Sequence, residues 1–160
     1  MNSNIIKGVC ITARDVALFE YLFLSKVATA RQIFRDVFGS AGLRIVQRRL
    51  KLLLDENYLT AAAIPEKPPK LIYSITEKAF NKYLSPRLKR QWTQLKSDSP
   101  LHDMVLVDVR SHLRHCPKVI SYITENAIES EFDCPLSFPI MPFLEMHSDA
   151  AILFKNDGEV

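Results

Sequence analysis

Residues 41–56, AGLRIVQRRLKLLLDE, constrain the fold more than any other stretch, because two different stripes run along one predicted helix. Apolar residues recur at helical spacing and form the first stripe: Val46, Leu50, Leu53 and Leu54. The second stripe is polar and basic and contains Arg44, Gln47, Arg48 and Lys51. A helix of this kind packs its apolar side on a core and presents its basic side either to solvent or to a polyanion.

The residues before this helix predict two further helices. Thr12 is a suitable N-cap, with Asp15 three residues later as its partner, for a helix over residues 13–25. Thr29 is a second N-cap and opens a shorter helix over residues 30–38. The segment GSAG then forms the turn that leads into the basic helix. A short helix, a small-residue turn and a longer basic helix are typical of a helix-turn-helix.

Two strands are predicted directly after the basic helix, at residues 58–64 and 70–75. The proline-containing segment PEKPP between them forms a loop, since proline is excluded from helix interiors. Thr76 is the N-cap of another helix over residues 77–84. We therefore predict an α+β fold, in which an N-terminal winged helix-turn-helix is followed by a smaller α/β module.

Four segments carry a resemblance to a known family: ITARDVALFEYL, TARQIFRDVF, RRLKLLLDENYLTA and LIYSITEKAFNKYL. Over about residues 11–84 they resemble the winged-helix domain of the bacterial replication-relaxation proteins. The residues that match the family pattern are Thr12, Arg14, Asp15, Thr29, Gln32, Ile33, Arg48, Arg49, Leu50, Tyr73, Ile75 and Thr76. Ala79 departs from it, since the family commonly has glycine there. The resemblance implies winged-helix DNA binding and a truncated or degenerate nuclease-like C-terminal domain.

Charge is distributed unequally along the chain. Residues 1–99 contain 17 Lys and Arg against 8 Asp and Glu, a net charge of +9, whereas residues 100–160 contain 4 against 10, a net charge of −6. We predict a winged helix-turn-helix at 1–84, a linker helix at 85–99 and an acidic α/β module at 100–160. Trp92 in the linker is either a dimerisation or inter-domain anchor or a residue that docks the linker on its own domain.

The acidic module is expected to contain a helix over residues 101–115 and strands at 119–124 and 150–154. Prolines between residues 134 and 147 predict irregular structure there. An Asp-Gly turn at residues 155–158 predicts a hairpin whose second strand stops after two residues, which suggests a truncated module.

Asp149 stands where a nuclease of the PD-(D/E)xK type has its first metal-binding aspartate, but no E-x-K follows. His112 and His115 have the spacing of a helical zinc-binding pair, without a clear third ligand. We expect no catalytic residue, no metal, no cofactor and no enzymatic activity. Three widely separated cysteines and the lack of an apolar leader or membrane span favour a cytoplasmic protein.

These patterns favour a double-stranded DNA-binding protein, either a transcriptional regulator or a plasmid or mobile-element replication or mobilisation factor. The candidate base-reading residues are Arg44, Gln47 and Arg48. The candidate phosphate contacts are Arg31, Arg35, Arg49, Lys51, Lys67 and Lys70. A homodimer would suit paired half-sites. The alternatives are a winged-helix protein-interaction module, in which the acidic half masks the basic face, and a metal-dependent nuclease.

Overall fold

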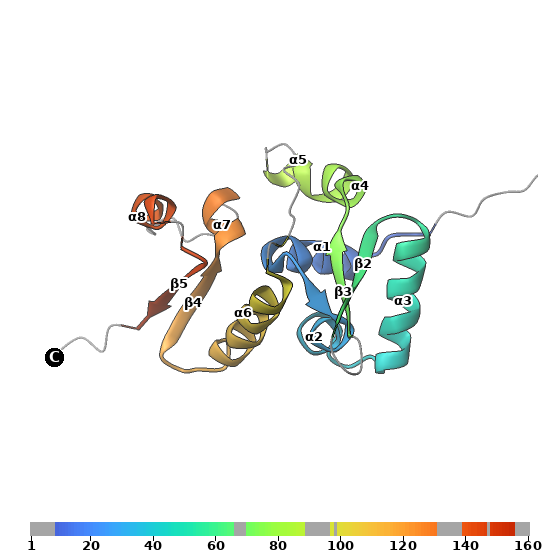
Figure 1. Ribbon diagram of the computed structural model, residues 1–160, viewed down its shortest axis with the longest axis horizontal. Coiled ribbons are helices and arrows are strands. Elements are labelled where there is room, and N and C mark those ends of the chain that lie inside the picture. The colour runs from blue at the N-terminus through green and yellow to red at the C-terminus, as the bar shows by residue number, and fades with distance from the viewer. Residues whose placement is uncertain are drawn as a thin grey trace, which may run out of the picture.

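The computed structural model describes residues 9–65, 70–88, 97, 99–130, 139–146 and 148–155. They form a mixed α+β fold with two small antiparallel sheets, as predicted for the fold class. Figure 1 shows helix α3 (Leu43–Asp55) at one end of the molecule. Strands β4 (Val119–Thr124) and β5 (Ala150–Phe154) lie at the other end, with helices α7 (Glu125–Ser130) and α8 (Ile140–Glu145) beside them. The other helices and the three-stranded sheet lie between these ends.

The first two helices begin where capping residues predict them. Helix α1 spans Ala13–Ser25, and Thr12 and Asp15 form its capping box, with the Thr12 backbone nitrogen 2.7 Å from Asp15 Oδ2. Thr29 and Gln32 form a second capping box at the start of α2, Ala30–Ile33. A π-helical turn, η1, continues the chain over Phe34–Phe38. Each cap satisfies backbone N–H groups that a helix start leaves without partners.

Helix α3 spans Leu43–Asp55 and follows Gly42 as its N-cap. Val46, Leu50 and Leu53 are completely buried, and Leu54 is half-buried against the same core. The predicted apolar stripe is therefore the side on which α3 packs. Burying aliphatic side chains of this size contributes roughly 1.5–3 kcal/mol each, which fixes the rotation of α3 about its axis.

The larger sheet has the strand order β1-β3-β2, and all of its pairs are antiparallel. Strands β2, Leu59–Ile64, and β3, Lys70–Ile75, form the predicted hairpin. The two-residue strand β1, Ala28–Thr29, pairs with β3 and was not predicted. This pairing anchors the start of α2 to the hairpin.

Short helical segments follow the hairpin: α4 (Glu77–Ala79), the π-helical turn η2 (Phe80–Leu84) and α5 (Ser85–Leu88). Thr76 caps α4 through its side chain, as predicted. Trp92 and most of the predicted linker lie outside the described residues.

The C-terminal segment begins with α6, Pro100–Leu113, which has proline in its first turn. Strands β4 (Val119–Thr124) and β5 (Ala150–Phe154) pair with each other. Helix α7, Glu125–Ser130, continues directly from β4. The expected turn at residues 155–158 falls almost entirely outside the described residues.

The prediction of irregular structure over residues 134–147 is wrong for part of that range, because α8 spans Ile140–Glu145. Pro142 is the third residue of α8. Proline is accommodated in the first turn of a helix, where the missing N–H would have no partner within the helix.

The basic and acidic segments share one hydrophobic core. Val107 of α6, Ile123 of β4 and Ile128 of α7 belong to the same buried cluster as Phe19 and Leu22 of α1. The boundaries proposed at residues 84 and 99 remain predictions, but the two segments pack as one body in the described structure. No helix in the described ranges has the length and apolar character to cross a bilayer.

Asn126 joins α7 to the end of α1 and provides a test of this shared core. Its side chain is buried and donates a hydrogen bond of 2.5 Å to the carbonyl oxygen of Phe23. Asn126→Ala should lower the free energy of unfolding by roughly 1–3 kcal/mol, because a buried carbonyl loses a donor. Urea denaturation measures the change. Asn81→Ala is the matched control, since Asn81 is exposed, and equal midpoints for the two variants would contradict the prediction.

Candidate nucleic-acid interface

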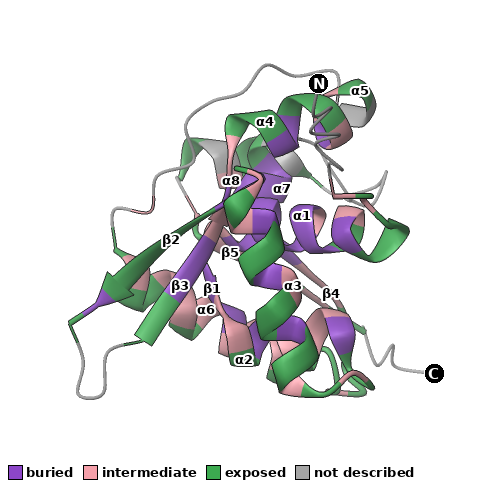
Figure 2. Cartoon of the chain, turned by 90° about the vertical axis from the view of Figure 1, so that its right-hand side faces the viewer, coloured by how far each residue is buried: buried purple, intermediate pink, exposed green. Residues whose placement is uncertain are grey.

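The outward side of α3 carries the predicted basic stripe. Arg44, Gln47, Arg48 and Lys51 are all exposed, opposite the buried residues of the same helix. Figure 2 shows this outward side of α3 turned toward the viewer. Within the described part of the chain, none of these four side chains has a hydrogen-bond or ion-pair partner. The stripe therefore presents three cations and one amide on the surface of α3.

Arg49 does not belong to this stripe, although we predicted it to contact phosphate. Its guanidinium donates to both carboxylate oxygens of Asp15, at 2.8 Å from Nε and 2.5 Å from Nη2, and also to the carbonyl of Cys10. Asp15 is only 1% exposed. The geometry thus gives Arg49 a role inside the protein, where it ties α3 to the start of α1.

The pKa of Asp15 reflects this environment. Burial by itself would raise the pKa, but the hydrogen bonds from Arg49 and Thr12 outweigh it and lower the pKa below its ordinary value. Asp36 behaves in the same way: burial opposes its charge, while hydrogen bonds from Arg35, Tyr21 and Ser111 lower its pKa. Both carboxylates are therefore held in their charged form by neighbouring donors and by donors from other elements, Arg49 for Asp15 and Tyr21 and Ser111 for Asp36.

The lowered pKa values of Asp15 and Asp36 predict that the folded state loses stability in acid. Aspartate in an unfolded chain titrates near pH ~3.9, so the stabilisation by Asp15 and Asp36 is fully present above about pH 5. It is lost as the pH falls through their lower folded-state pKa values, because the unfolded chain then binds more protons. Urea unfolding between about pH 7 and pH 2.5 measures this loss. In an Asp15→Asn variant, the free energy of unfolding should fall less steeply with decreasing pH than in the wild type. An equally steep fall would exclude Asp15 as a contributor to this pH dependence.

Arg35 is exposed, but its guanidinium is also paired with carboxylates of the protein. It donates to Asp36 at 2.7 Å and to Asp108 of α6 at 2.8 Å, and these carboxylates offset its charge. Burial and Asp36 also raise the pKa of the Tyr21 hydroxyl, which stays protonated and donates to Asp36 at 2.8 Å. The acidic segment therefore neutralises a basic residue of η1. Ion pairs described for this segment do not involve α3, which lies at the opposite end from β4 and β5 (Figure 1).

Four of the predicted residues line one open groove of about 780 Å³ beside the hairpin: Arg31, Arg35, Gln47 and Lys70. Leu71 and Tyr73 of β3 and residues of α6 also line it. Arg31 and Lys70 are exposed. Lys67 lies outside the described residues. The groove brings cations from α2 and β3 next to the flank of α3, which the sequence did not reveal.

Two exposed apolar residues on α3 were missed by the sequence analysis. Ile45 is 59% exposed and Leu52 is 46% exposed, and neither belongs to the apolar stripe. They are seven residues apart, so they lie on the same side of the helix, adjacent to Arg48. The signal was present in the sequence as two apolar residues at helical spacing outside the predicted core side.

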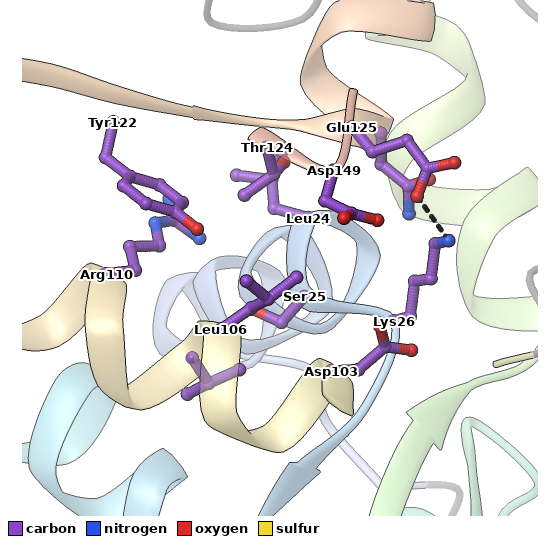
Figure 3. Close-up of a pocket in the computed structure, with 12 residues that line it drawn as sticks. Leu24, Ser25, Lys26, Asp103, Leu106, Arg110, Tyr122, Thr124, Glu125 and Asp149 are labelled. Atoms are coloured by element: carbon purple, nitrogen blue, oxygen red, sulfur yellow. Dashed lines mark hydrogen bonds and ion pairs between the residues drawn. The ribbon is translucent and has the colours of Figure 1, made fainter. Parts of the chain in front are cut away.

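A small cavity lies where the two segments meet, and Asp149 is at its edge (Figure 3). Its volume is about 30 Å³. Lys26 and Glu125 form an ion pair of 2.5 Å beside it, and the buried Oγ of Ser25 has no hydrogen-bond partner in the described structure. Asp149 itself is well exposed, with one oxygen 3.8 Å from His102 Nε2.

The described part of the chain contains no set of side chains suited to bind a metal ion. No group of three or more His, Cys, Asp or Glu side chains there has the geometry to hold a metal ion. His112 Nδ1 instead lies 2.8 Å from the backbone oxygen of Asp108. The nuclease hypothesis and the zinc hypothesis gain no geometric support from these residues.

No protein-family model matches this sequence, and neither a curated protein nor a solved structure matches the chain. Any functional assignment therefore depends on the sequence and the geometry of the chain itself.

Proposed function

We propose that residues 9–84 form a winged helix-turn-helix that binds double-stranded DNA, with α3 as the recognition helix and the β2–β3 hairpin as the wing. The observation that carries this proposal is the exposed stripe of Arg44, Gln47, Arg48 and Lys51, which has no partner in the described structure. A purely solvated helix face usually mixes charges of both signs, whereas this stripe contains no acidic residue before Asp55.

The dimensions of α3 suit this function. Its 13 residues span about 20 Å at 1.5 Å per residue, and the major groove of B-DNA, about 12 Å wide, admits an α-helix. Arginine donates in pairs to guanine and glutamine pairs with adenine, so Arg44, Gln47 and Arg48 are assigned to base edges. Lys51 is assigned to a phosphate.

The groove beside α3 extends this contact surface. Arg31 on α2 and Lys70 on β3 line this groove, and we assign them to the phosphates that flank the major groove. Arg35 and Arg49 are left out of the interface, because each is engaged with buried or half-buried carboxylates. The resemblance to replication-relaxation proteins favours a transcriptional regulator or a plasmid or mobile-element replication or mobilisation factor, without enzymatic activity.

Fluorescence anisotropy with a pool of duplex DNA tests this proposal. We expect binding to weaken steeply as salt rises from about 50 to 200 mM, because each phosphate contact releases counterions. Some sequences should retain tight binding at about 150 mM salt, which non-specific polyanion binding does not do. The Arg44→Ala/Arg48→Ala double variant should lose that specific binding. Equal affinity for duplex DNA and heparin, unaffected by the double variant, would overturn the proposal.

An exposed apolar stripe on α6 favours a second candidate function, protein interaction. Leu101 and Val105 are 52% and 60% exposed, and Val109 follows one turn later on the same side of α6. If this stripe holds a homodimer together, Val105→Glu should lower the molecular mass measured by light scattering to that of a monomer without altering the fold. An unchanged mass would mean that the stripe does not support the protein-interaction function.

A further inference from the structure

We propose that Ile45 reads thymine by packing against its 5-methyl group in the major groove. This inference depends on the proposed DNA-binding function and names one chemical feature of the target sequence. Ile45 is 59% exposed on a helix whose core positions are completely filled by Val46, Leu50 and Leu53. Ile45 therefore does not contribute to the hydrophobic core, and packing within the protein gives no reason for an apolar side chain at this position.

The position of Ile45 along α3 points to the bases rather than to the backbone of the duplex. Its backbone nitrogen donates to the carbonyl oxygen of Gly42 at 2.8 Å, so it belongs to the first turn of α3. In helix-turn-helix proteins, the N-terminal residues of the recognition helix contact the base edges. Leu52 lies about 10 Å further along the axis, two turns later, and is not assigned to a base.

The charge around Ile45 identifies the partner. Arg44 precedes it, and Arg48 is its neighbour one turn later, so any partner that covers Ile45 must also accept two guanidinium groups. A duplex supplies anionic phosphates and guanine acceptors for the arginines. The apolar group that a base pair presents in its major groove is the 5-methyl of thymine. An aliphatic side chain beside two arginines is therefore matched to a thymine close to guanine.

Deoxyuridine substitution tests this contact, because deoxyuridine differs from thymidine only by the missing methyl group. The probe is the duplex that binds best in a selection with the full chain, with each thymine replaced in turn. We expect one or two replacements to weaken wild-type binding roughly fourfold, the loss that corresponds to one buried methyl-sized group. Ile45→Ala should bind the original and the substituted duplex equally, whereas Leu52→Ala should respond like the wild type.

The outcomes separate this inference from the proposed function. If no deoxyuridine replacement weakens the affinity of the wild type, the assignment of Ile45 is overturned and DNA binding is left intact. An Ile45→Ala variant that responds like the wild type would overturn it too. If no duplex is bound by the wild type, the proposed function is itself overturned, and the assignment of Ile45 is overturned with it.

Discussion

Replacing Arg49 by alanine is expected to lower the free energy of unfolding by about 3 kcal/mol, the lower end of the cost of breaking a buried ion pair. The reason is that Asp15, which is 1% exposed, would keep a buried charge without its guanidinium partner. We take the lower end because the Arg49 side chain is 22% exposed, so water partly screens the pair. Urea denaturation followed by circular dichroism at neutral pH measures the change.

Arg49→Lys is the informative control for this prediction. It keeps a positive charge but replaces the two-pronged guanidinium contact with a single ammonium, so we expect an intermediate loss of stability. At temperatures where Arg49→Ala remains folded, its affinity for duplex DNA should equal that of the wild type. A variant with normal stability and reduced affinity would restore Arg49 to the interface and contradict its role in joining α3 to α1.

Arg48→Ala is expected to have the opposite profile, with unchanged stability and DNA affinity lowered by about 1–3 kcal/mol, which is roughly 5- to 150-fold. Arg48 is exposed and has no partner in the described structure, so its removal takes nothing from the fold. If it reads a guanine, the loss should be confined to sequences that contain that guanine, and discrimination at that position should relax. Anisotropy titrations on the preferred duplex and on single-base variants measure both effects.

Arg114→Ala is the matched control for Arg48→Ala, because Arg114 is also exposed but follows α6, away from α3. It should leave the affinity almost unchanged. An equal loss on every duplex for Arg48→Ala would make Arg48 a phosphate contact instead of a base reader. Equal small effects for Arg48→Ala and Arg114→Ala would remove the basic stripe from the proposed interface.

The residues that carry the resemblance to replication-relaxation proteins are largely scaffold residues. Thr12 and Asp15 cap α1, Thr29 and Gln32 cap α2, and Arg49 binds Asp15 across the two helices. Gln32 also donates to the carbonyl of Met104 at 3.0 Å, which joins α2 to α6. A motif built from such residues indicates how the helices begin and pack.

Local interactions explain which elements the sequence predicted correctly. The bounds of α1, the basic helix and the β2–β3 hairpin followed from capping residues, side-chain periodicity and the proline loop, all of which act over a few residues. Strand β1 was missed because two residues carry no periodicity, and its pairing with β3 is a long-range contact. Helix α8 was missed because its proline was read as a breaker without knowledge of where the helix starts.

The candidate site shows the same division between what the sequence determined and what tertiary structure decided. Helical spacing alone placed Arg44, Gln47, Arg48 and Lys51 on one side of α3, opposite the core, because a helix fixes the relative directions of its own side chains. Only the folded structure separated Arg48 from Arg49. These neighbours point about 100° apart around the helix, and the carboxylate that engages Arg49 comes from a residue 34 positions away in the chain. Packing between distant segments thus decided which arginine supports the fold and which remains exposed on the surface.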